Sequence, residues 1–257
     1  MSFLIVDLTS KGLIFGADRN VTTIYSDGTQ NQNTKTEKVL KWTNDKALIG
    51  FVGQGSIGNY STTDFVKDFI KRYPDFKSLE TISEILRSEV EAQRKIDEGN
   101  NKPEMLIFHI GGFETVNSCI VPKVYMVTNI HALDPKIGYT DVRKEFKSTE
   151  ELKNYFPNID PANFKSTIAE LENKLEPFWF HQGFDLMTFN ILHSSLKLAF
   201  KSLIQNHPKH KLPTTLEEWV KHSKMQILMY GSYFESFHPP DKLYVGGGAD
   251  ILSLEWK

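Results

Sequence analysis

The chain has 257 residues, of which 40% are hydrophobic and 12% aromatic, so it can bury a large core. Thirty Lys and Arg residues against 32 Asp and Glu residues leave a net charge of -2. This balance argues against a nucleic-acid partner, because no basic field is available to neutralise phosphates. No apolar run approaches the ~20 residues that span a bilayer, so we expect no membrane partner.

The single cysteine, Cys119, cannot form an internal disulfide. No cationic region followed by an apolar segment opens the chain, and a strand-like run begins within the first few residues. Together these features predict a cytoplasmic protein.

The chain is expected to start in a β-sheet. Residues 3–8 (FLIVDL) and 12–17 (GLIFGA) are apolar runs of strand length joined by Thr-Ser-Lys-Gly. This pattern predicts a tight hairpin in which Gly12 supplies a positive φ. The polar stretch 25–37 has no periodicity and is predicted to be a surface loop.

Two more strands, at 38–42 and 47–53, precede a pair of predicted helices. The first helix follows a capping-box-like Ser61-Thr-Thr-Asp64 sequence and stops at Pro74. Its apolar positions recur at helical spacing: Val66, Phe69, Ile70 and Tyr73. The second helix is predicted to end near Gly99, and its apolar positions are Leu79, Ile82, Leu86 and Val90.

Residues 104–112 and 122–130 are predicted to form a second antiparallel hairpin. After it, residues 146–180 are predicted to form short amphipathic helices broken by Pro157 and Pro161. We interpret this segment as an insertion or lid.

Two long helices and a strand complete the predicted elements. The segment 184–204 is apolar almost all round, which predicts burial between layers. Another helix begins after Pro213 with a capping box at Thr214 and Glu217, and the last strand is predicted at 242–256. The resulting order of elements favours an α+β fold, with helices on antiparallel sheets, over a doubly wound parallel sheet.

Gly53, Gly55 and Gly58 form a literal GxGxxG motif between a strand and a helix, so a nucleotide-binding enzyme is a remote alternative. A dinucleotide-binding unit needs a crossover helix that returns, within about 30 residues, to a parallel strand ending in an acidic residue. Here the next strand begins only at residue 104, and Asp75 lies in a predicted loop. The spacing therefore argues against this alternative.

The first 53 residues fit a different pattern. The blocks SFLIVDLTSKGLIFGADRNVTT (2–23) and KVLKWTNDKALIGFVG (38–53) resemble the proteasome β-subunit family of N-terminal nucleophile (Ntn) hydrolases, most closely its bacterial ATP-dependent proteasome-like peptidase. The matching features are a strand ending in Ala-Asp, a Lys-Val at the third strand, an Asn-Asp-Lys turn and a Gly-Phe-x-Gly strand end. The terminal GGGADILSL is similar to the Gly-Gly-x-Asp strand of the family, whereas 146–180 has no counterpart.

The resemblance implies a four-layer α-β-β-α sandwich of two antiparallel sheets, in a single domain over residues 1–257. It also implies hydrolysis of a peptide or amide bond without a cofactor or metal, by subunits that assemble as a homo-oligomer. The eight histidines agree with the absence of a metal, because none of them has metal-ligand spacing.

By the same resemblance, Ser2 falls on the position of the nucleophile, which removal of Met1 would expose. A free α-amine has a pKa of about 7.7–8.0, so it could act as general base for the hydroxyl of its own residue. Lys38 would lie beside Ser2 and disfavour protonation of that amine, and Asp18 would pair with Lys38. The oxyanion hole would be formed by backbone N–H groups at Gly50, Val52 and Gly53, and the substrate pocket by Asn20 and Val21.

The sequence departs from the family pattern in three places. The nucleophile is serine where the family has threonine. His181-Gln182-Gly183 replaces a supporting Ser-Gly, and a later aspartate falls at Lys242, with Asp241 next to it. These differences leave a second interpretation, in which the chain is a catalytically inactive, proteasome-like structural subunit.

Overall fold

The structure is a computed structural model. It describes residues 3–24, 30–33, 35–96, 104–134, 138–183, 186–207, 209–237 and 247–256.

The first sheet has four antiparallel strands in the order β12-β1-β2-β13. Their bounds are Phe178–Gly183 (β12), Phe3–Thr9 (β1), Gly12–Asp18 (β2) and Ala249–Glu255 (β13). The predicted hairpin at the start of the chain is confirmed, since β1 pairs with β2 across Thr9 and Gly12. Every residue of β1 and β2 is buried, because these two strands are the centre of the sheet.

The positive φ predicted for Gly12 is wrong. Gly12 does not have a positive φ; a Cβ at this position would lie 2.2 Å from the carbonyl oxygen of Leu254 in β13. The hairpin is closed instead by the hydroxyl of Thr9, which donates to Gly12 O at 3.0 Å and accepts from Gly12 N at 3.0 Å. Gly12 is thus required by the close approach of the neighbouring strand.

Replacing Gly12 with alanine is expected to lower the free energy of unfolding by about 1–3 kcal/mol, because the new methyl group would overlap a backbone atom that cannot move alone. Urea unfolding measures this change. Gly55→Ala is the matched control, since its Cβ would meet only a side-chain atom, Val21 Cγ1, at 3.0 Å. Equal losses in the two variants would contradict this explanation.

The second sheet has five antiparallel strands in the order β11-β10-β9-β6-β5. Their bounds are Gly138–Glu150 (β11), Cys119–Asp134 (β10), Leu106–Val116 (β9), Ala47–Gly53 (β6) and Val39–Lys41 (β5). The second predicted hairpin is confirmed as β9 and β10, joined by Asn117 and Ser118, which both have positive φ. Because β6 runs antiparallel to both neighbours, the parallel crossover that a dinucleotide site requires is not present around the glycine motif.

Two small strand pairs correct the sequence-based predictions further. β3 (Val21–Ile24) pairs with β4 (Gln30–Asn33), so part of the predicted loop 25–37 is a strand. β7 (Ser56–Ile57) pairs with β8 (Tyr60–Ser61) around a turn in which Gly58 has φ 57°. The GxGxxG motif therefore ends in a two-residue hairpin turn, and not at the first turn of a helix.

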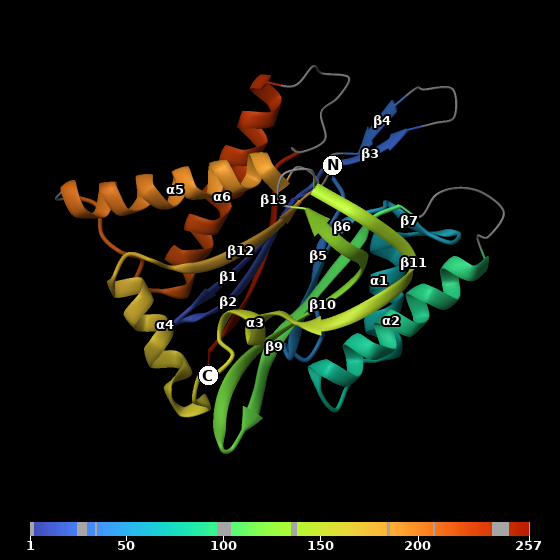
Figure 1. Cartoon of the computed structure of the whole chain (residues 1–257), viewed down its shortest axis with the longest axis horizontal. Helices are drawn as coiled ribbons and strands as arrows, with labels where there is room; N and C mark the ends of the chain where they lie inside the picture. Colours follow the sequence, from blue (N-terminus) through green and yellow to red (C-terminus); the bar gives the residue numbers. More distant parts are fainter. Residues whose placement is uncertain are drawn as a thin grey trace.

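The two sheets pack face to face between two layers of helices, as Figure 1 shows. One core cluster fills the space between the sheets and includes Leu4, Phe15, Leu48 and Val52. A second cluster lies between the second sheet and its helices, and a third between the first sheet and its helices. The α+β class and the α-β-β-α order of layers are therefore as predicted, and each sheet buries both of its faces.

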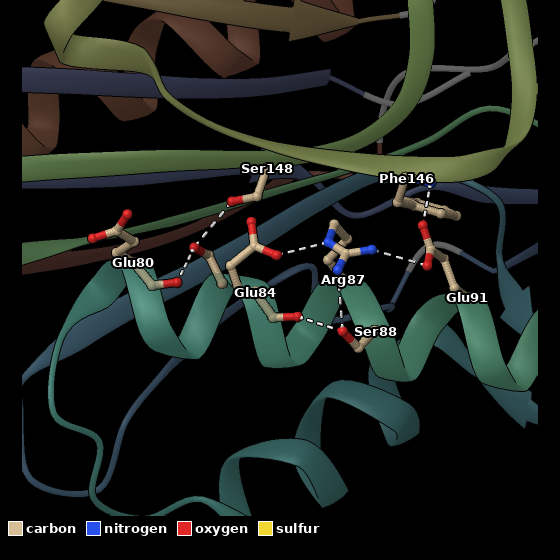
Figure 2. Close-up of polar contacts among 8 residues, drawn as sticks. Glu80, Glu84, Arg87, Ser88, Glu91, Phe146 and Ser148 are labelled. Carbon is tan, nitrogen blue, oxygen red and sulfur yellow. Dashed lines mark hydrogen bonds and ion pairs between the residues drawn. The ribbon is translucent and has the colours of Figure 1, made fainter.

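The helices α1 (Thr62–Arg72) and α2 (Leu79–Ile96) cover the second sheet. The predicted cap of α1 is confirmed, because the Ser61 hydroxyl accepts from Asp64 N at 3.0 Å. Figure 2 shows how α2 is tied to β11: Arg87 bridges Glu84 and Glu91 on the helix, and Glu91 accepts from the backbone N–H of Phe146 at 2.7 Å. The predicted end of α2 near Gly99 lies outside the described residues.

The segment 146–180 contains two short helices and a 3₁₀ turn between the ends of two strands. The bounds are Glu151–Tyr155 (α3), Pro161–Asn163 (η1) and Phe164–Asn173 (α4). Residues 146–150 were predicted to be helical but continue β11, because pairing with β10 outweighs their local helical pattern. Leu152, Phe164 and Ile168 belong to the core between the sheets. The interpretation of residues 146–180 as an insertion or lid stays a prediction.

The helices α5 (Leu186–Asn206) and α6 (Leu216–Phe237) cover the outer face of the first sheet. The prediction that 184–204 is buried between layers is wrong for its described side chains, because α5 belongs to an outermost layer. Ile191 is 58% exposed and Leu198 is 70% exposed, and only one side of the helix packs inward, through Leu192 and Leu196. Within the described part of the chain, no helix has the length and apolarity needed to cross a membrane.

Candidate active site

Asp18 is the last residue of β2, and its carboxylate is the centre of a buried polar cluster. Asp18 Oδ1 accepts from the backbone N–H of Phe3 at 2.8 Å, and Oδ2 accepts from the backbone N–H of Asn20 at 3.3 Å. Only 1% of Asp18 is exposed. The carboxylate therefore fixes the first described residue of β1, which directly follows Ser2 in the sequence.

Lys38 comes directly before β5 and reaches across to the first sheet. Its Nζ lies 2.9 Å from Asp18 Oδ1 and also donates to the carbonyl oxygen of Asn20. Lys38 is fully buried, and burial lowers its pKa, whereas the neighbouring Asp18 acts in the opposite direction. The structure thus brings Asp18 and Lys38, which are 20 residues apart, into a buried ion pair that joins the two sheets.

Asp250 completes the cluster, although the sequence analysis did not select it. Its Oδ2 accepts from the backbone N–H groups of Lys38 at 2.8 Å and Val39 at 2.9 Å. Its Oδ1 lies 3.9 Å from the Arg19 guanidinium. Asp250 therefore holds the start of β5, which sets the position from which the Lys38 side chain extends. The Gly-Gly-x-Asp pattern of the last strand contained this residue, but the pattern alone did not indicate a role.

The strand end proposed as an oxyanion hole is part of β6. The N–H of Phe51 donates to Lys38 O at 3.1 Å, so it is already used. Gly50 is opposite Val39 on one side and His109 on the other, and a Cβ at Gly50 would lie 2.7 Å from a methyl carbon of Leu4. Gly53 has φ 106°, which favours glycine. The close packing of Gly50 and the conformation of Gly53 are structural reasons for glycine at both positions, and the oxyanion role of this strand end stays a prediction.

The two residues predicted to line the substrate pocket, Asn20 and Val21, differ in burial. Asn20 is fully buried and its carbonyl oxygen accepts from Lys38, whereas Val21 is half-buried at the start of β3. The side chain of Val52 belongs to the core between the sheets, and the oxyanion role of its backbone N–H stays a prediction.

Several predicted residues lie outside the described part of the chain. These are Ser2, Asp241 and Lys242, together with the side chains of His181 and Gln182. The backbones of His181 and Gln182 are described, and they pair with Ile5 and Leu4 in β1.

His109 is a buried histidine that sequence analysis did not single out. It lies on β9 with its ring 5.6 Å from that of Phe180, and neither ring nitrogen has a hydrogen-bond partner among the described residues. Burial lowers its pKa from 6.5 to about 3. The unfolded chain therefore takes up a proton below about pH 6.5 while folded His109 stays neutral until about pH 3, so this histidine reduces stability as the pH falls through that window.

Replacing His109 with leucine is expected to raise the free energy of unfolding by about 1–3 kcal/mol near neutral pH, because it removes two unpaired polar atoms from the core. The variant should also lose stability less steeply than the original chain between pH 6.5 and about 3. Chemical denaturation at several pH values measures both effects. A lower stability of His109→Leu at neutral pH would show that the imidazole has a favourable partner.

The comparisons with known proteins are sparse. No protein-family model matches the sequence, and no curated protein matches it. Among solved structures, the fold is similar to that of an Anbu (Gly-1) mutant from Hyphomicrobium sp. strain MC1. The two chains are 15% identical with a TM-score of 0.49, and the match covers 99% of this chain and 82% of that chain. This likeness is too distant to support a function, and the assignment of the fold depends on the layers and strand order described above.

Proposed function

We propose that this chain hydrolyses an amide or peptide bond with Ser2 as an N-terminal nucleophile, after removal of Met1. The observation that carries the proposal is the fully buried Lys38–Asp18 ion pair, whose carboxylate also accepts from the backbone N–H of Phe3. Removing a charged pair from solvent is costly, so the place of this pair beside the residue that follows Ser2 favours a role in catalysis over one in stability.

In the proposed reaction, the free α-amine of Ser2 takes the proton of the Ser2 hydroxyl as the oxygen attacks the substrate carbonyl carbon. The tetrahedral oxyanion is stabilised by a backbone N–H group at Gly50, Val52 or Gly53, since the N–H of Phe51 already donates to Lys38 O. The C–N bond of the substrate then breaks, the leaving amine receives the proton, and an ester of Ser2 remains. Water attacks the ester with the amine again as general base, which releases the acid and restores the hydroxyl.

Lys38 and Asp18 have separate roles in this proposal. The positive charge of Lys38 disfavours protonation of the nearby α-amine, so the base is available near neutral pH. Asp18 orients Lys38 and, through Phe3, the first strand.

Labelling with a β-lactone tests the proposal, because such a probe acylates a reactive serine. We expect one covalent adduct on the peptide that begins with Ser2 and none in Ser2→Ala, whereas Ser2→Thr should keep the reaction because it keeps a hydroxyl. Equal labelling of the original chain and Ser2→Ala would exclude Ser2 as the nucleophile. No labelling of a correctly processed chain would favour the alternative of an inactive structural subunit.

A further inference from the structure

An open pocket of about 360 Å³ lies between α5 and the residues that follow α4. It is lined by Leu175, Glu176, Lys197, Leu198 and Lys201. The first two residues follow α4, and the other three lie on α5. Its volume is in the range of small-molecule sites, which begins at about 300 Å³.

The Lys197 ammonium group has no carboxylate within 4.0 Å in the described part of the chain. Its Nζ lies 5.0 Å from the centre of the Trp179 ring, and the side chain is half-buried. Burial lowers the pKa of Lys197, opposed by the charges of Asp7 and Glu176. A counter-ion lowers the free energy of a partly desolvated cation, so an anion would be bound favourably beside Lys197.

The second lysine of the pocket is paired with the only carboxylate among the lining residues. Lys201 Nζ lies 3.6 Å from Glu176 Oε1, so the two lysines and one glutamate leave a net charge of +1 on the walls. The side chains of Leu175 and Leu198 provide apolar walls, and Leu198 is 70% exposed. Leu175 has φ 59°, and the N–H groups of Leu175 and Glu176 donate to Glu172 O and Leu171 O, so the end of α4 holds Leu175 in place.

From these contacts we infer that the pocket binds a small organic monoanion, a carboxylate with a short apolar tail. The carboxylate pairs with Lys197, and the tail lies against Leu175 and Leu198. This inference does not depend on the proposed hydrolysis, since none of these residues belongs to the Asp18–Lys38 cluster.

Asp7 makes the proposed site sensitive to pH. It lies on β1, 2% exposed, and its Oδ2 accepts from the Ser223 hydroxyl of α6, while Oδ1 has no partner among the described residues. Burial raises the pKa of Asp7 to about 7, against the lowering effects of Ser223 and of Lys197 on α5. The other titratable groups described near Asp7 and Lys197 are His193 beside Trp179, Glu176 and Lys201 in the pocket, and His222 and Tyr230 on α6. Burial lowers the pKa of His222 to about 4, so it is neutral near pH 7.

Ionisation of Asp7 therefore competes with the bound anion for the charge of Lys197. Below about pH 7 Asp7 is neutral and Lys197 attracts the ligand alone, whereas above this value the two negative charges share one ammonium group. The affinity for the anion should fall as the pH rises through about 7.

Isothermal titration with hexanoate tests the inference on the full chain. At a pH about one unit below the pKa of Asp7, we expect saturable binding of hexanoate to the original chain. Binding should be at least roughly tenfold weaker in Lys197→Met. It should not change in Lys209→Met, since Lys209 is exposed and lies outside the pocket. Acetate and inorganic phosphate, which lack the tail, should bind about tenfold more weakly than hexanoate. Equal binding by the original chain and Lys197→Met, or by hexanoate and phosphate, would overturn the inference.

The role of Asp7 is tested with Asp7→Asn, which keeps an oxygen for Ser223 but cannot ionise. The affinity of Asp7→Asn for hexanoate should be the same at about pH 6 and about pH 8. The affinity of the original chain should fall several-fold over the same interval. Thermal unfolding of each variant shows whether it is folded. An unchanged pH dependence in folded Asp7→Asn would exclude Asp7 as the linked group.

Discussion

Replacing Lys38 with methionine is expected to lower the free energy of unfolding by about 3–5 kcal/mol and to abolish labelling of Ser2. The variant leaves the Asp18 carboxylate buried beside an apolar side chain, where it still accepts from the N–H groups of Phe3 and Asn20 but loses its counter-ion. Denaturant unfolding and adduct mass measure the two effects separately.

The control for this prediction is the double variant Lys38→Met with Asp18→Asn. It removes both charges, so it should be more stable than Lys38→Met alone while its Ser2 remains unlabelled. If the double variant were labelled like the original chain, the ion pair would have no part in the reaction. If it were as unstable as the sum of the single variants, the two charges would not interact.

Replacing Asp250 with alanine is expected to lower the free energy of unfolding by about 2–6 kcal/mol. The reason is that the buried N–H groups of Lys38 and Val39 lose their acceptor, at about 1–3 kcal/mol for each. The start of β5 would also be released, so the labelling rate of Ser2 should fall with the stability.

Asp250→Asn separates the hydrogen bonds from the charge. Its amide oxygen can still accept from both N–H groups, and what is lost is the charge, which attracts Arg19 at 3.9 Å and acts more weakly on Lys38 than the charge of Asp18 does. We therefore expect Asp250→Asn to remain close to the original chain in both unfolding and labelling. Equal damage by alanine and asparagine would show that the charge, and not the hydrogen bonds, holds β5.

The layers of the fold could be predicted because their elements have strong local patterns. The hairpin of β1 and β2 is two apolar runs around a short turn, and α1 has both its cap at Ser61 and its apolar spacing in one stretch. What local patterns could not show was pairing at long range. Residues 146–150 look helical but are held as a strand by β10, and the apolar α5 lies in an outer layer with Leu198 exposed.

The candidate site, like the fold, could be predicted from the sequence only in part. The resemblance placed Asp18 and Lys38 together, and the structure has them 2.9 Å apart. Asp250 is 212 residues from Lys38, and only the fold shows that its carboxylate accepts from that backbone. The buried His109 and Asp7 were not predicted, because a single polar residue in an apolar strand carries no sign of whether it has a partner.

The most direct test of the central claim is the mass of the intact chain isolated from its native source. The proposed mechanism predicts a chain that begins at Ser2, because only a free α-amine on that residue can serve as the base for its own hydroxyl. A chain that keeps Met1 would contradict the proposed mechanism, since Ser2 would then have an amide nitrogen in place of the amine.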